Sequence, residues 1–114
     1  MSPLNSPSLP PFTVPPGWTR EMSSPDIRHE WEGHESEGPT LARQYGLGPA
    51  WPVMEDTEAS FTIFQSDGKF YLWQRMEDDL YEIGCRDICE IALKISQSKF
   101  RDLRVDRLPP PHLP

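Results

Sequence analysis

The prolines of this chain are concentrated at its two ends. Six of the fourteen fall within residues 1–16 and four within residues 109–114, while none lies between Val53 and Leu108. Proline fixes φ and removes a backbone donor, so proline-dense segments are extended and rarely form a core. The distribution predicts three parts: a proline-rich, acidic arm over residues 1–50, an α+β core over residues 51–108, and a proline-rich tail over residues 109–114.

The arm is expected to be largely extended or disordered. A short helix over residues 40–45 is compatible with it, because Gly38-Pro39-Thr40 is typical of a helix start and Gly46 of a stop. Three Ser-Pro pairs resemble proline-directed phosphorylation sites and leave regulation of the arm open; they begin at Ser2, Ser6 and Ser24.

Composition limits the class of protein. With 114 residues the chain is one domain at most, and its 36% apolar and 25% charged residues indicate a small core diluted by polar flanks. A net charge of −7 disfavours nucleic acid as a partner, since phosphate binding relies on clustered lysine and arginine. We find neither a signal-peptide pattern nor an apolar run that approaches the roughly 20 residues of a membrane span. With two cysteines, we expect no membrane association and a cytoplasmic or nuclear location.

The strongest local signal is a β-hairpin. Two runs rich in aromatic and branched residues, 61–65 and 69–74, flank Asp67-Gly68, a pair typical of a two-residue type I′ turn. The turn sets a register that pairs Phe64 with Tyr71, Ile63 with Leu72, and Thr62 with Trp73. One face then carries Phe61, Ile63, Phe70 and Leu72 and the other Phe64, Tyr71 and Trp73, so both faces are apolar.

The residues after the hairpin complete the predicted fold. Residues 80–83 favour a third strand, residues 86–100 show the apolar spacing of an amphipathic helix, and residues 101–108 allow a last strand. The fold class is therefore α+β: a small antiparallel β-meander of three to four strands, packed by one C-terminal helix and preceded by the flexible proline-rich arm.

A single helix cannot cover both apolar faces of the hairpin. We therefore expect an aromatic sheet face, or an edge strand, to bind another protein. The chain is predicted to be a non-catalytic intracellular protein–protein interaction module or subunit, whose partner is a larger protein or a second copy in a homodimer. The candidate protein-binding residues are Trp51, Phe64, Tyr71 and Trp73.

The alternative is a small acidic inhibitor or immunity-type protein that blocks a basic enzyme or nucleic-acid site. Binding led by charge weakens steeply with ionic strength, whereas apolar binding does not, so salt dependence separates the two hypotheses. The carboxylates of such a surface are Glu30, Glu32, Glu35, Glu37, Glu77, Asp78 and Asp79.

Several polar groupings lack the spacing that their chemistry needs. His29 and His34 are five residues apart, whereas a zinc-protease helix places its two histidines one helical turn apart. Cys85 and Cys89 do not form a CxxC motif, although a helix N-terminus could lower the pKa of Cys85 and make an enzyme that uses this thiol a third alternative. We assign no catalytic residue, no metal ligand and no cofactor, and expect no enzymatic activity.

One segment resembles part of a known family. Phe70–Ile83 followed by a helix is similar to the closing strand–turn–strand–helix of SUKH-type proteins, which include bacterial toxin-immunity proteins and fungal cell-wall regulators. The helices and central motif that precede this unit in the family have no counterpart in this chain, so the resemblance assigns no family.

Overall fold

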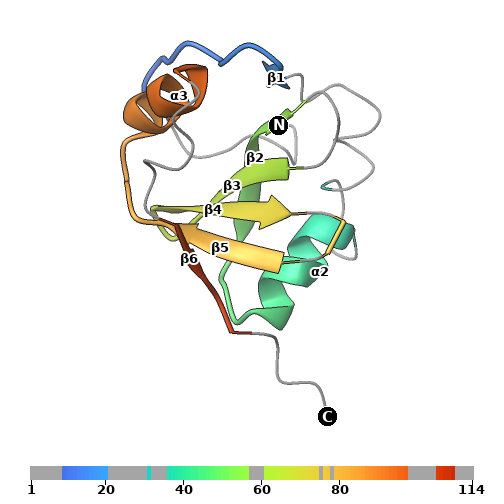
Figure 1. The fold of residues 1–114 in the computed structure, drawn as a ribbon. Helices are drawn as coiled ribbons and strands as arrows, with labels where there is room; N and C mark the ends of the chain where they lie inside the picture. Colours follow the sequence, from blue (N-terminus) through green and yellow to red (C-terminus); the bar gives the residue numbers. More distant parts are fainter. Residues whose placement is uncertain are drawn as a thin grey trace, which may run out of the picture.

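The computed structural model describes residues 9–20, 31, 36–56, 61–74, 76–77, 79–97 and 105–109. Within these residues the chain is an α+β protein (Figure 1). Its elements in chain order are β1 (Trp18–Thr19), α2 (Glu37–Gln44), β2 (Ala50–Asp56), β3 (Phe61–Ser66), β4 (Lys69–Gln74), β5 (Asp79–Ile83), α3 (Ile88–Ser96) and β6 (Val105–Arg107).

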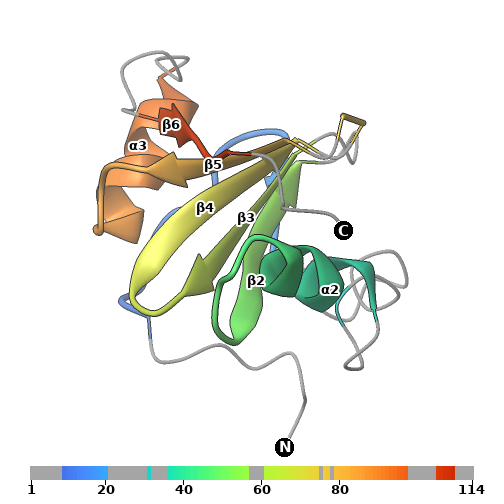
Figure 2. The same cartoon turned by 90° about the horizontal axis from the view of Figure 1, so that it is seen from below.

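The six strands form one antiparallel sheet whose spatial order is the chain order, β1-β2-β3-β4-β5-β6. The two helices lie on opposite sides of this sheet (Figure 2). Neither helix of the described residues has the length and hydropathy that crossing a membrane requires.

The sheet is larger than predicted: it has six strands rather than three to four, and a second helix, α2, accompanies the C-terminal one. β2 was missed because Pro52 interrupts its pattern. In the structure the pairing with β3 shifts register between Pro52 and Met54, and such an irregularity tolerates a residue without an N–H. β1 has two residues, which is too few to show any periodicity. Both β1 and α2 come from residues 1–50, which the proline content assigned to the arm; α2 overlaps the short helix that residues 40–45 allowed there, but begins earlier and packs on the sheet.

The predicted hairpin is confirmed. Asp67 and Gly68 adopt φ of 52° and 76°, the left-handed conformation that a type I′ turn needs at both positions. Phe64 pairs with Tyr71, and the other two predicted pairs, Ile63 with Leu72 and Thr62 with Trp73, are also present.

Alternate residues of the hairpin strands enter two separate cores, as the period of a strand requires. The first core cluster, on the α3 side, consists of Val53, Met54, Ile63, Phe70, Leu72, Ile83, Ile88 and Ile91. The second core cluster, on the α2 side, consists of Trp31, Leu41, Phe64, Tyr71, Trp73 and Leu80.

The last two described elements are α3, which covers one face of the sheet, and β6, which forms one of its edges. α3 begins after Asp87, whose carboxylate accepts a hydrogen bond of 2.9 Å from the N–H of Cys89 and so caps the helix. The predicted last strand is present as β6, which pairs with β5. There the Arg107 guanidinium lies 2.7 Å from the Asp79 carboxylate.

Candidate protein-binding surface

Three of the four predicted binding residues are buried by the chain itself. Phe64 and Trp73 have no exposed surface, and Tyr71 is 4% exposed. Burial raises the pKa of the Tyr71 hydroxyl, and the nearby carboxylates of Glu82 and Asp67 raise it further. In the folded chain these three side chains are not available to a partner.

The fourth residue, Trp51, is partly exposed. It lies on β2 opposite Gln65 and belongs to neither core cluster. The structure therefore separates Trp51 from the other three candidates instead of bringing all four to one site.

The prediction that one sheet face stays open is wrong, because Trp31 and α2 cover it. The Trp31 ring lies 5.4 Å from the Phe64 ring and meets the Trp73 ring edge-on at 6.2 Å. Leu41 of α2 joins this second core cluster, and Tyr45 and Leu47 pack at its margin. These contacts supply the cover that a partner was expected to provide.

Sequence reasoning missed Trp31 because residues 26–37 are acidic and contain only one other apolar side chain, Ile27. Without a repeating pattern, nothing marked this tryptophan as part of a core. The usable signal was the residue type itself, since tryptophan is highly buried on average even where its neighbours are polar.

The two edges of the sheet are poorly suited to pairing with an added strand. The end strands are β1, with two residues, and β6, with three. In β6, Asp106 and Arg107 are exposed, and short or charged end strands discourage further pairing. On β2, β1 pairs only with Glu55 and Asp56, and Pro52 removes one donor from the remaining stretch. We therefore do not place a binding site at an edge strand.

A different surface already holds an extended segment of chain. Residues 9–20, here called the strap, run across the molecule from α3 to β1 (Figure 1). Leu9, Phe12 and Trp18 pack against the first core cluster, and Pro15 is fully buried. The exposed residues between them are Pro10, Pro11, Thr13, Pro16 and Gly17.

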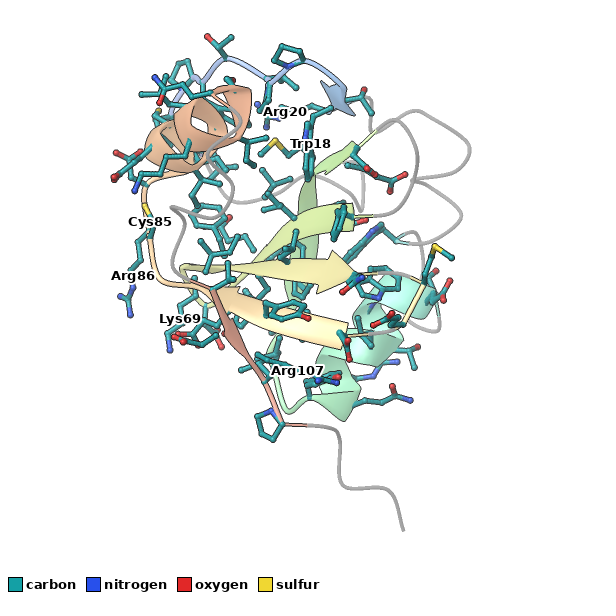
Figure 3. The ribbon with its side chains drawn as sticks, viewed as in Figure 1. Trp18, Arg20, Lys69, Cys85, Arg86 and Arg107 are labelled. Atoms are coloured by element: carbon teal, nitrogen blue, oxygen red, sulfur yellow. The ribbon has the colours of Figure 1, made fainter. Side chains whose placement is uncertain are left out.

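One hydrogen bond from α3 holds the first part of the strap, the pairing of β1 with β2 holds its last part, and a further contact lies within the strap itself. The Cys89 thiol on α3 donates to the carbonyl oxygen of Pro11 at 3.3 Å, a contact between residues 78 positions apart. The Arg20 guanidinium lies 4.5 Å from the centre of the Phe12 ring, a cation–π distance. Arg20 lies together with Trp18 between α3 and β1 (Figure 3). The strap is thus held by the α3 side of the fold as a bound peptide would be.

The environment of Cys85 opposes a reactive thiolate. Its sulfur lies 3.4 Å from the Glu90 carboxylate and 3.6 Å from the carbonyl oxygen of Asp87, just ahead of α3 (Figure 3). Burial raises the pKa of the Cys85 thiol; a backbone hydrogen bond with Asp87 partly offsets this, and Glu90 raises the pKa further. The shift is opposite to the one expected from a helix N-terminus.

We expect Cys85 to react with iodoacetamide at pH 7.5 more slowly than a cysteine in an unfolded peptide, and Glu90→Gln to accelerate the reaction. A raised pKa leaves less thiolate at that pH, and removing the Glu90 charge lowers the pKa again. Mass spectrometry after trypsin digestion measures each thiol separately, since cleavage follows Arg86. Glu77→Gln, an exposed residue between β4 and β5, is the matched control and should change nothing. Equal rates in Glu90→Gln and the unmodified chain would contradict this assignment.

The other polar candidates do not form a site in the described residues. Asp79 is engaged by Arg107, and Glu37 lies in the first turn of α2. Within the described ranges no three His, Cys, Asp or Glu side chains are grouped so that they could hold a metal ion. Glu77 is exposed between β4 and β5. The other candidates lie outside the described residues: His29, His34, Glu30, Glu32, Glu35 and Asp78.

Comparison of the chain with protein-family models, curated proteins and solved structures gives no match. The resemblance to SUKH-type proteins accordingly gains no support.

Proposed function

We propose that this chain is a non-catalytic protein–protein interaction module that binds an extended, proline-rich segment on the α3 side of its sheet. The observation that carries the proposal is the strap, whose residues Leu9, Phe12 and Trp18 pack on this side and whose Pro15 is fully buried. A surface that binds one such segment in the same chain has the shape and chemistry to bind a similar segment from another. Polyproline segments suit this role because they lose little conformational freedom on binding.

A neighbouring apolar side chain extends the same surface. Leu93 is 56% exposed and lies one helical turn after Cys89, the residue that contacts Pro11. A ligand longer than the strap would therefore meet a further apolar contact on α3.

Binding of a strap peptide in trans tests the proposal. The probe is a fluorescent peptide with the sequence of residues 9–20, LPPFTVPPGWTR, titrated by anisotropy against the full chain carrying Phe12→Ala. Phe12 is only partly buried, so this variant weakens the strap and leaves both core clusters intact. We expect saturable binding, because the weakened strap leaves its surface open to the peptide.

Two controls make this result specific. A peptide with alanine in place of both aromatic residues should not bind, and circular dichroism should show that Phe12→Ala remains folded. Leu9→Ala provides a second weakened strap if the first variant unfolds. Absence of saturable binding in a folded variant would overturn the proposed function, and so would equal binding of the alanine peptide.

A further inference from the structure

The positions of the buried strap residues indicate which sequence pattern this surface would recognise. Leu9 and Phe12 pack on the first core cluster and Pro15 is buried, at intervals of three residues, with Pro10, Pro11 and Thr13 exposed and Val14 half-buried between them. Three residues per turn is the period of the polyproline II helix, so this spacing is the one that an edge of such a helix would present to the fold. The spacing, and not proline content alone, therefore determines which side chains reach the surface.

A tight turn after Pro15 positions Trp18, the last strap residue that contacts the first core cluster. The N–H of Trp18 donates to the carbonyl oxygen of Pro15 at 3.1 Å, and Gly17 adopts a φ of 84°. Proline followed by glycine with positive φ is typical of a type II turn. This turn directs the chain into β1 and places Trp18 against the first core cluster.

The strap is held more weakly than the cores. Leu9, Phe12 and Trp18 are only partly buried, and the hydrogen bond to Pro11 comes from a thiol, which is a weak donor. Segments with few fully buried contacts detach at a lower free energy than the global fold. Pro15 is fully buried, but β1 adds only two paired residues at the edge of the sheet. The strap, with β1, can therefore leave its surface while the pairings among β2, β3, β4, β5 and β6 remain.

Because the strap belongs to the chain, it competes with any ligand from outside. We propose that the strap is an internal competitor that keeps this surface closed, and that the ligand which displaces it repeats the strap's own pattern. That pattern is an apolar residue at the first and fourth positions, proline at the seventh, and tryptophan at the tenth after a Pro-Gly turn. This inference rests on the proposed function, since it assumes that the surface binds segments in trans.

Competition from the strap should lower the affinity of a peptide by a measurable factor. A tethered segment acts at an effective concentration of about millimolar, so a ligand in trans must overcome it. The apparent affinity falls in proportion to the fraction of molecules whose surface is open. We therefore expect the peptide LPPFTVPPGWTR to bind the unmodified chain at least about tenfold more weakly than it binds Phe12→Ala.

The experiment compares three full-length proteins with one peptide. Thr13→Ala, which changes an exposed strap residue, should match the unmodified chain, while Phe12→Ala should bind at least about tenfold more tightly than either. A second peptide with the Phe and Thr positions exchanged breaks the three-residue spacing and should bind Phe12→Ala about tenfold more weakly than the first peptide.

The outcomes separate the two proposals. Equal affinity of the unmodified chain and Phe12→Ala for the peptide would overturn internal competition and leave the proposed function standing. Equal affinity for the two peptides would overturn the pattern. Absence of binding to every folded protein would overturn the proposed function itself.

Discussion

Trp73→Ala is expected to lower the free energy of unfolding by about 3–5 kcal/mol. Trp73 has no exposed surface, and its ring meets Trp31 at the centre of the second core cluster. Truncation removes the buried indole and leaves a cavity that Phe64 and Leu80 cannot fill without moving. A loss of this size is a large part of the stability of a small domain. Urea unfolding followed by circular dichroism measures it.

Trp51→Ala is the matched control for this variant. It removes the same side chain from a position that is partly exposed and outside both core clusters, so the expected loss is only about 1 kcal/mol. Similar losses for the two variants would show that the second core cluster is not a packed core. The assignment of α2 and Trp31 as its cover would then be wrong.

Gly38→Ala is expected to destabilise the fold by about 1–3 kcal/mol, although alanine normally favours a helix over glycine. Gly38 lies in the first turn of α2, and an added Cβ would stand 2.6 Å from Cδ2 and Cε2 of Trp31 and 2.7 Å from Cε3. Ring atoms in a buried cluster cannot give way as a flexible side chain would. Thermal and urea unfolding of the variant measure the effect.

A double-mutant cycle identifies the cause. In a Trp31→Leu background the clash is absent, so Gly38→Ala should cost little there, and the two substitutions should be strongly coupled. Gly46→Ala serves as a contrast, because Gly46 has a φ of 76° and open space around its Cβ position. Its cost comes from the backbone and should be the same with either residue at position 31. An additive Gly38–Trp31 cycle would contradict the contact.

The features that sequence predicted are those encoded by neighbouring residues. The β3–β4 hairpin follows from Asp67-Gly68 and its flanking strands, and the division of Ile63 and Phe64 between two faces follows from strand geometry. The position of α3 follows from its apolar spacing. Each of these signals is contained within a short stretch of chain, where local preference and tertiary structure agree.

The features that sequence did not predict depend on contacts between distant segments. Trp31 has no periodic neighbours, and only its packing on Phe64 and Trp73 defines its role. The strap appeared too rich in proline to belong to a fold, yet its residues Leu9, Phe12 and Trp18 pack on the first core cluster. The predicted open face of the hairpin was wrong for this reason. Local patterns show that an apolar sheet face must be covered, but they do not show which segment of the chain covers it.

The order of the strands also bears on how the chain acquires its structure. Since the strands follow one another in the sheet as in the chain, the pairings among β2, β3, β4 and β5 close short loops and demand little entropy. The contact between Pro11 and Cys89 instead closes a loop of 78 positions. A nascent chain exposes residues 9–20 long before α3 has been synthesised, so the contact of Pro11 with Cys89 forms only after most of the sheet residues have been made.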